Sequence, residues 1–156
     1  MSEKRKTGTA GDRISVIEIN TLWFGIDILK SREVIPLPRI TPVPNTPEFV
    51  LGVFNLRGDI FTLLDISTIL DMKAKQIQNS DMVILLDNNN TSLGILADRI
   101  LGVRFIDNTR LKPSRGVVSQ KMAEFVAGVL TEKNSEIYLL DIDRLFASAA
   151  LRADNY

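Results

Sequence analysis

The feature that most constrains the fold of this chain is an internal repeat. Residues 48–70 read EFVLGVFNLRGDIFTLLDISTIL, and residues 124–146, which begin 76 positions later, read EFVAGVLTEKNSEIYLLDIDRLF. Both stretches open on EFV followed by GV, and both carry LLDI at the same position. Self-similarity of this kind indicates that one supersecondary unit was duplicated. It predicts two similar units within one chain.

Each copy of the repeat is predicted to be a β-hairpin. In the first copy two apolar runs, 49–56 and 60–66, flank Arg57-Gly58. Glycine adopts without steric cost the positive φ that a tight hairpin turn requires. In the second copy Lys133-Asn134 stands at the same place, and asparagine tolerates positive φ better than most residues. The duplication therefore covers turn chemistry as well as hydrophobic pattern.

The rest of the chain is also predicted to be mostly β-strand, because β-branched and apolar runs alternate with turn residues. Strands are expected at 13–20, 23–28, 33–37 and 81–87, with two more between 91 and 106 around Leu101-Gly102. Short helical segments are expected at 29–32 and 67–70, a polar helix-and-loop section at 71–80, a turn at 88–90, a loop at 107–123 and a helix at 143–151.

Two segments are predicted to lie outside the regular strands. Residues 1–12 are polar and charged, so we expect a disordered tail and not a signal peptide. Five of the six prolines lie within 36–47, and proline cannot donate to a sheet. This stretch is therefore expected to be a stiff connector along a sheet edge.

Many short strands and few helices predict an all-β fold class. We expect one domain, 13–151, made of two pseudo-duplicated five-stranded barrels that share a core, with short helices and a C-terminal helix. The barrels would cover roughly 13–80 and 81–151. An exchange of the N- and C-terminal segments between them is left open.

Composition excludes most catalytic chemistry. The 156 residues include no cysteine and no histidine, which removes the thiolate nucleophile, the commonest general base and the commonest metal ligand. No glycine-rich phosphate loop or metal-binding spacing is present. We therefore expect no enzyme activity, no cofactor and no metal. The 19 basic and 19 acidic residues balance, which argues against nucleic acid as a partner. No apolar run is long enough to span a bilayer, so we expect a cytoplasmic chain.

The two hairpin turns differ in a way that suggests a task for the first. Leu56 and Arg57 stand opposite Glu132 and Lys133, so the first turn is more apolar and carries an arginine. An arginine among apolar side chains is typical of protein-binding hot spots. The alternative is a turn with a solvated arginine.

Other candidates also have two interpretations. Asp65 and Asp141 are matched acids after the second strand of each hairpin, and they are either helix caps or part of a carboxylate pair. Trp23-Phe24 either packs in the core or seam or stacks on a ligand. The segment 30–34 is either a solvated edge or a strand that pairs with another protein.

Several motifs together resemble the CheW family. They are FGIDILK at 24–30, ITPVPNTPEF at 40–49, GV at 52–53, NLRG at 55–58 and LDI at 64–66. The resemblance runs in order over residues 13–146. It implies two five-stranded barrels similar to Src-homology-3 domains, which agrees with the repeat, and a non-enzymatic adaptor of bacterial chemotaxis. The chain length would leave no room for a fused kinase or receiver domain.

The resemblance also implies partners. The chain would couple the cytoplasmic tip of a chemoreceptor, a methyl-accepting chemotaxis protein, to the regulatory domain of the histidine kinase CheA in membrane-associated arrays. That kinase domain is itself CheW-like, so the two would alternate in rings. The contact residues implied are Arg57, Asn55, Leu56 and Gly58 for receptor and kinase, and Ser31, Glu33 and Gly52 for a kinase-facing edge, with Gly52 keeping its strand thin enough for close approach.

Two alternatives stay open at this point. The chain departs from the usual family pattern at Trp23, Ser31 and Thr62, which leaves the pathway undecided between flagellar chemotaxis, twitching motility and another array system. A second class of function is a small-ligand sensor that uses the groove between the barrels as its pocket.

Overall fold

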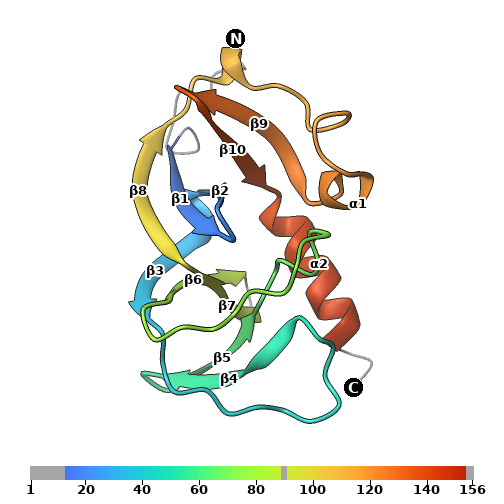
Figure 1. Ribbon diagram of the computed structural model, residues 1–156. Coiled ribbons are helices and arrows are strands. Elements are labelled where there is room, and N and C mark those ends of the chain that lie inside the picture. Colours follow the sequence, from blue (N-terminus) through green and yellow to red (C-terminus); the bar gives the residue numbers. More distant parts are fainter. Residues whose placement is uncertain (1–12, 89–90, 154–156) are drawn as a thin grey trace.

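The computed structural model describes residues 13–88 and 91–153, and these residues form two five-stranded sheets with a few short helices (Figure 1). The strands are β1 Arg13–Ile19, β2 Leu22–Asp27, β3 Ser31–Pro36, β4 Val50–Leu56, β5 Asp59–Leu64, β6 Met82–Asn88, β7 Thr91–Ala97, β8 Arg99–Phe105, β9 Val126–Glu132 and β10 Ser135–Leu140. The helices are the 3₁₀ turns η3 Ile28–Lys30 and η4 Asn108–Arg110, and the α-helices α1 Gln120–Ala123 and α2 Ile142–Ala153. The all-β prediction is confirmed.

The two sheets have the same topology. Sheet A runs β8-β1-β2-β10-β9, and sheet B runs β3-β6-β7-β5-β4. In each sheet the second strand of the repeated hairpin pairs in parallel with the central strand, β10 with β2 in sheet A and β5 with β7 in sheet B. The register is also the same, since Leu139 pairs with Gly25 in sheet A and Leu63 pairs with Gly94 in sheet B. The duplication seen in the sequence is therefore also present in the strand order and register. Sheet A takes its strands from both ends of the described chain, whereas sheet B comes from the middle.

A shared core joins the sheets. Strand side chains alternate between two faces, so β6 sends Val83 and Leu85 into a core inside sheet B and Ile84 and Leu86 toward sheet A. The strand predicted at 81–87 is confirmed, and its run Val83–Leu86 is buried on both faces. The shared cluster also holds Phe24 of β2 and Phe146 of α2. Helix α2 accordingly lies beside both sheets (Figure 1).

A connector runs along the edge strand of each sheet. In sheet B, Thr41 of the proline-rich segment forms an antiparallel bridge with Val53 of β4, as the edge-connector prediction requires. In sheet A, Lys112 forms the equivalent bridge with Val129 of β9. Each bridge satisfies backbone groups of an edge strand that would otherwise be open to another chain.

Glycine makes the first of these bridges possible. Gly52 has φ +152°, and a Cβ at this position would lie 2.5 Å from the carbonyl oxygen of Thr41 and 2.5 Å from Ile40 Cγ2. No other residue fits without moving the connector. The close approach expected at Gly52 is therefore made by the protein's own chain.

The two matched acids both accept backbone hydrogen bonds. Asp65 Oδ1 accepts a hydrogen bond from the Ser67 backbone N–H at 3.0 Å, and Asp65 Oδ2 accepts one from the Lys75 N–H at 2.9 Å. Asp141 Oδ1 accepts from the Arg144 N–H at 3.1 Å, three positions into the start of α2. The helix-cap interpretation is correct for Asp141, whereas Asp65 accepts backbone N–H bonds from a segment of turns that contains no helix.

Several expected boundaries differ from the structure. The break between β7 and β8 was expected at Leu101-Gly102 but lies at Asp98, and both residues belong to β8. Gly102 lies beside a register shift in the pairing of β8 with β1, and its φ is +101°. Residues 67–70 form hydrogen-bonded turns instead of a helix, and 71–80 contain no helix. The expected tail, 1–12, and most of the turn at 88–90 lie outside the described residues. Within the described ranges, no helix has the length and hydrophobicity that crossing a membrane requires.

Candidate functional site: the tip–edge surface

The candidate site joins the turn of the β4–β5 hairpin, residues 55–60, to the edge strand β3, residues 31–34; we call it the tip–edge surface. In the turn, Arg57 has φ +49° and Gly58 has φ +90°, which is the paired left-handed geometry of a tight hairpin. Asn55 Oδ1 accepts a hydrogen bond from the Gly58 N–H at 3.2 Å. The NLRG motif thereby closes its own turn through Asn55 and leaves the arginine side chain at the surface.

Two ion pairs connect the turn to the edge strand. The Arg57 guanidinium donates to the Glu33 carboxylate, and Arg32 Nη2 lies 3.3 Å from Asp59 Oδ2. The Arg57 side chain remains 60% exposed and that of Glu33 34% exposed. Exposed pairs of this kind contribute little to stability, about 0–1 kcal/mol. Their effect is to place charges of known sign on one surface.

Aromatic side chains support the surface from below. Phe54 and Phe61 stack with ring centroids 5.4 Å apart, and both are buried. The Arg32 guanidinium lies 5.4 Å from the centroid of the Phe61 ring, in cation–π distance. The hairpin and the edge strand are therefore held together by packing as well as by charge.

Apolar side chains surround these charges at the surface. Ile60 is 58% exposed and Leu29, just before β3, is 65% exposed. Val34 on β3 is 37% exposed, and Leu56 is half-buried. A partly apolar surface that includes an exposed arginine has the composition of a protein-binding hot spot.

The predicted contact residues do not all lie together. The structure brings Asn55, Leu56, Arg57 and Gly58 to the turn, and Glu33 next to them. Ser31 is half-buried, and its hydroxyl donates to the Ile28 carbonyl at 3.3 Å. Gly52 is buried beneath the connector and contributes to the surface only by shaping the strand.

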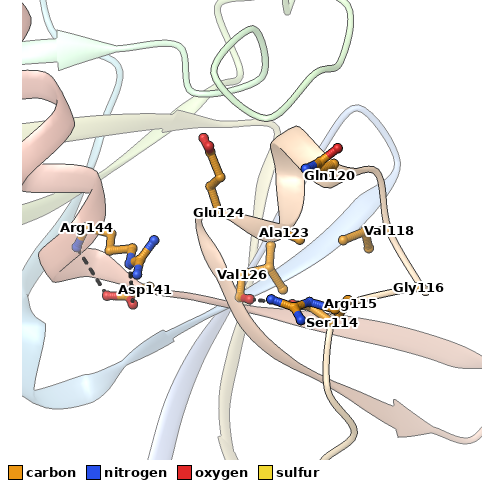
Figure 2. Close-up of a pocket in the computed structure, with 10 residues that line it drawn as sticks. All are labelled: Ser114, Arg115, Gly116, Val118, Gln120, Ala123, Glu124, Val126, Asp141 and Arg144. Carbon is orange, nitrogen blue, oxygen red and sulfur yellow. Dashed lines mark hydrogen bonds and ion pairs between the residues drawn. The ribbon is translucent and has the colours of Figure 1, made fainter.

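A separate cavity of about 710 Å³ lies between the start of β9, the start of α2 and the loop 114–124 (Figure 2). Ser114 Oγ donates to the Val126 carbonyl at 2.8 Å on one side of it, and Arg144 turns toward Asp141 on the other. Arg115 and Glu124 are exposed to solvent. All the lining residues come from 114–144, so this cavity is not a pocket shared by residues of both sheets.

Comparison with known proteins identifies the family. The profile of the CheW-like domain matches residues 13–150. The chain belongs to the CheW family. The chemotaxis protein CheW of Rhizobium meliloti is 28% identical over 149 residues, covering 95% of this chain and 96% of that protein. The chemotaxis protein CheW of Thermotoga maritima is 30% identical over 135 residues, covering 86% and 87%.

A solved structure agrees with the sequence comparisons. The scaffolding protein TtCheW from Thermoanaerobacter tengcongensis aligns with a TM-score of 0.75 and 25% identity, covering 84% of this chain and 89% of that one. The chain is thus a non-enzymatic scaffold protein of the CheW family, whose members belong to chemotaxis signalling. The family resemblance predicted from the GIDILK and NLRG motifs is confirmed.

Sequence reasoning missed two residues of the tip–edge surface. Asp59 forms the second ion pair with Arg32 of the candidate edge 30–34, and Ile60 supplies exposed apolar area. Ile60 could have been found, because it alternates with buried Phe61 directly after the turn and must face outward. The pairing of Arg32 with Asp59 gives no signal in the sequence, since the two residues lie far apart in the chain.

Proposed function

We propose that this CheW-family protein is an adaptor that couples the cytoplasmic tip of a chemoreceptor to the regulatory domain of the histidine kinase CheA. The observation that supports this function best is the tip–edge surface itself. It presents an exposed arginine, a paired glutamate and exposed apolar side chains, all held in place by the two ion pairs and the Phe54–Phe61 stack. Such a surface recognises protein without needing a conformational change.

The duplication supports the second half of the proposal. Val34 on β3 and Val103 on β8 occupy equivalent positions of the two edge strands, and both are exposed, at 37% and 52%. Two similar apolar edges on one protein suit contacts with a partner of the same doubled fold on each side. The regulatory domain of CheA is such a partner in the family resemblance, so alternation in rings is the expected assembly.

The proposed working place is the cytoplasmic side of a receptor array, reached through partners. Chemotaxis is the first choice of pathway, because the relatives described above are named chemotaxis protein CheW. An adaptor of twitching motility is the remaining alternative. The small-ligand alternative gains no support from the cavity of about 710 Å³, since its lining comes from one half of the repeat and includes exposed charges.

The proposal is tested by co-purification with a CheA regulatory domain and a receptor-tip fragment, separately and together. We expect the chain to bind each one and to carry both in a single complex. In the same co-purification, a Val34→Asp variant should retain less of the CheA regulatory domain, while circular dichroism shows that the variant is still folded. Binding of neither partner, or mutually exclusive binding of the two, would refute an adaptor.

A further inference from the structure

A buried ionic cluster lies outside the tip–edge surface. Lys75 Nζ lies 2.8 Å from Asp81 Oδ2 and 2.8 Å from Asp98 Oδ1, and it donates to the Gln76 carbonyl at 2.9 Å. The Lys75 and Asp81 side chains are 1% exposed and the Asp98 side chain 30%. We call Lys75, Asp81 and Asp98 the clasp.

The clasp connects the two sheets through hydrogen bonds. Asp81 immediately precedes β6 of sheet B, and its backbone carbonyl accepts from the Leu37 N–H at 3.1 Å. Asp98 lies at the crossover from β7 of sheet B to β8 of sheet A. Its Oδ2 accepts from the Asn20 N–H at 2.7 Å, in the turn between β1 and β2. Lys75 therefore completes a continuous path from sheet B to sheet A.

The segment that carries Lys75 has no helix or strand of its own, yet it is fixed by polar contacts. The Lys75 backbone N–H donates to the buried Asp65 carboxylate, and the Lys73 carbonyl accepts from Asn20 Nδ2 at 2.9 Å. Desolvation lowers the pKa of Lys75, but its bonds to the two aspartates and their charges together raise that pKa above its usual value. The ammonium is thus charged at neutral pH.

Apolar contact and ionic contact constrain the sheets differently. The shared core between the sheets is extensive, but burial of apolar surface is non-directional and tolerates repacking. Buried ion pairs add little net stability, because desolvation offsets their attraction, but in some proteins they specify one arrangement of the elements they join. Among the contacts between the two sheets in the described residues, the clasp combines burial with short, directional bonds.

We propose that Lys75 is a positioning residue whose clasp holds the two sheets in one relative orientation. The shared core then supplies the attraction between the sheets, and the clasp selects one arrangement out of those that the core would tolerate. This inference concerns the chain alone and does not require the proposed adaptor function.

The experiment measures the distance between the sheets. The chain contains no cysteine, so Ile60→Cys on β5 and Thr131→Cys on β9 give two unique spin-label sites at exposed positions of sheets B and A. Pulsed electron resonance then compares this background with a neutral clasp, Lys75→Met with Asp81→Asn and Asp98→Asn. These asparagines keep an oxygen for the Gln78 and Asn20 N–H groups that the aspartates now accept from.

We expect one narrow distance in the background protein and, in the neutral clasp, a distribution about twofold broader or with a second maximum. The control is Arg99→Met, which removes an ion pair with Glu18 inside sheet A and should leave the distance unchanged. Thermal melting is recorded for all variants, because a merely stabilising role would lower the melting temperature without altering the distance.

An unchanged, narrow distance in the folded neutral clasp would overturn the proposal. If the triple variant does not fold, the same distance measurement is made on the single variant Asp98→Asn. This change weakens the contact between residue 98 and Lys75 and leaves the ion pair between Lys75 and Asp81 in place. A distance distribution in Asp98→Asn identical to the background would also overturn it.

Discussion

The two hairpins occupy equivalent places in the duplicated fold, but the ion pairs that join each hairpin to its edge strand differ. In sheet B the edge strand supplies the anion Glu33 and the turn supplies the cation Arg57. In sheet A the edge strand β8 supplies the cation Arg104, and the end of β9 supplies the anion Glu132, with Arg104 Nε 3.2 Å from Glu132 Oε1. In sheet B a second pair joins Arg32 of β3 to Asp59 of the hairpin, and the paired positions are not equivalent in the two copies. An exposed ion pair between edge strand and hairpin thus recurs while its residues differ, so these residues are free to serve a partner.

The largest expected effect concerns the two glycines beneath the connectors. In Gly52→Ala, the new Cβ would meet the Thr41 backbone at 2.5 Å, at a φ of +152°. In Gly128→Ala the nearest atom is Leu111 Cδ1, the movable end of a side chain, at 2.8 Å. We expect Gly52→Ala to lower the free energy of unfolding by about 3–4 kcal/mol and Gly128→Ala by about 1 kcal/mol.

Urea denaturation followed by the emission of Trp23, the only tryptophan, measures both. Equal losses of unfolding free energy in Gly52→Ala and Gly128→Ala would show that the two connectors pack equally tightly against their edge strands, and would contradict the expected difference between the two sheets.

A smaller difference is expected between the two matched acids. Asp65 is buried and accepts from Ser67 and Lys75, so Asp65→Asn turns one acceptor into a donor that faces an N–H group. This should cost about 2–3 kcal/mol of unfolding free energy. Asp141→Asn should cost less than about 0.5 kcal/mol, because Asp141 is half-exposed and asparagine caps helices equally well. Urea denaturation measures both variants. A loss for Asp141→Asn as large as that for Asp65→Asn would contradict the role of Asp141 as a simple, half-exposed helix cap.

The smallest effect is expected for the charges themselves. Glu33→Gln and Arg104→Gln each remove one partly exposed ion pair and should change the unfolding free energy by about 0.5 kcal/mol or less. Thermal melts of both variants check this. A loss well above 1 kcal/mol for Glu33→Gln alone would mean that the Glu33–Arg57 pair holds the fold together instead of presenting charges to a partner.

Much of the fold was predictable because the repeat is expressed in hydrophobic pattern and turn chemistry. The hairpins, the buried β6 and the edge connector follow from local sequence. Positive φ was predicted at Gly58 and Asn134. It is confirmed at Gly58, with φ +90°, and Arg57 before it has φ +49°. In the second turn the prediction is wrong, because the positive φ of +57° lies at Lys133 and not at Asn134.

The site was predictable only where its residues are adjacent in the chain. NLRG marks the turn, but the pairing of Arg57 with Glu33 and of Arg32 with Asp59 depends on how β3 lies against the hairpin. The clasp gives no sequence signal at all, since Lys75, Asp81 and Asp98 form no recognisable spacing. Long-range pairs of single charges are fixed by topology, which a single sequence does not display.

The most direct test of functional divergence between the halves is a titration of a receptor-tip fragment into two matched variants. Arg57→Asp and Lys133→Asp introduce the same change at equivalent turns, both at exposed side chains. Isothermal titration should show Arg57→Asp weakening receptor binding by about 2 kcal/mol, or roughly thirtyfold, with Lys133→Asp close to the unmodified chain. Equal weakening in both variants, or none in a folded Arg57→Asp, would contradict the assignment of the task to the first hairpin.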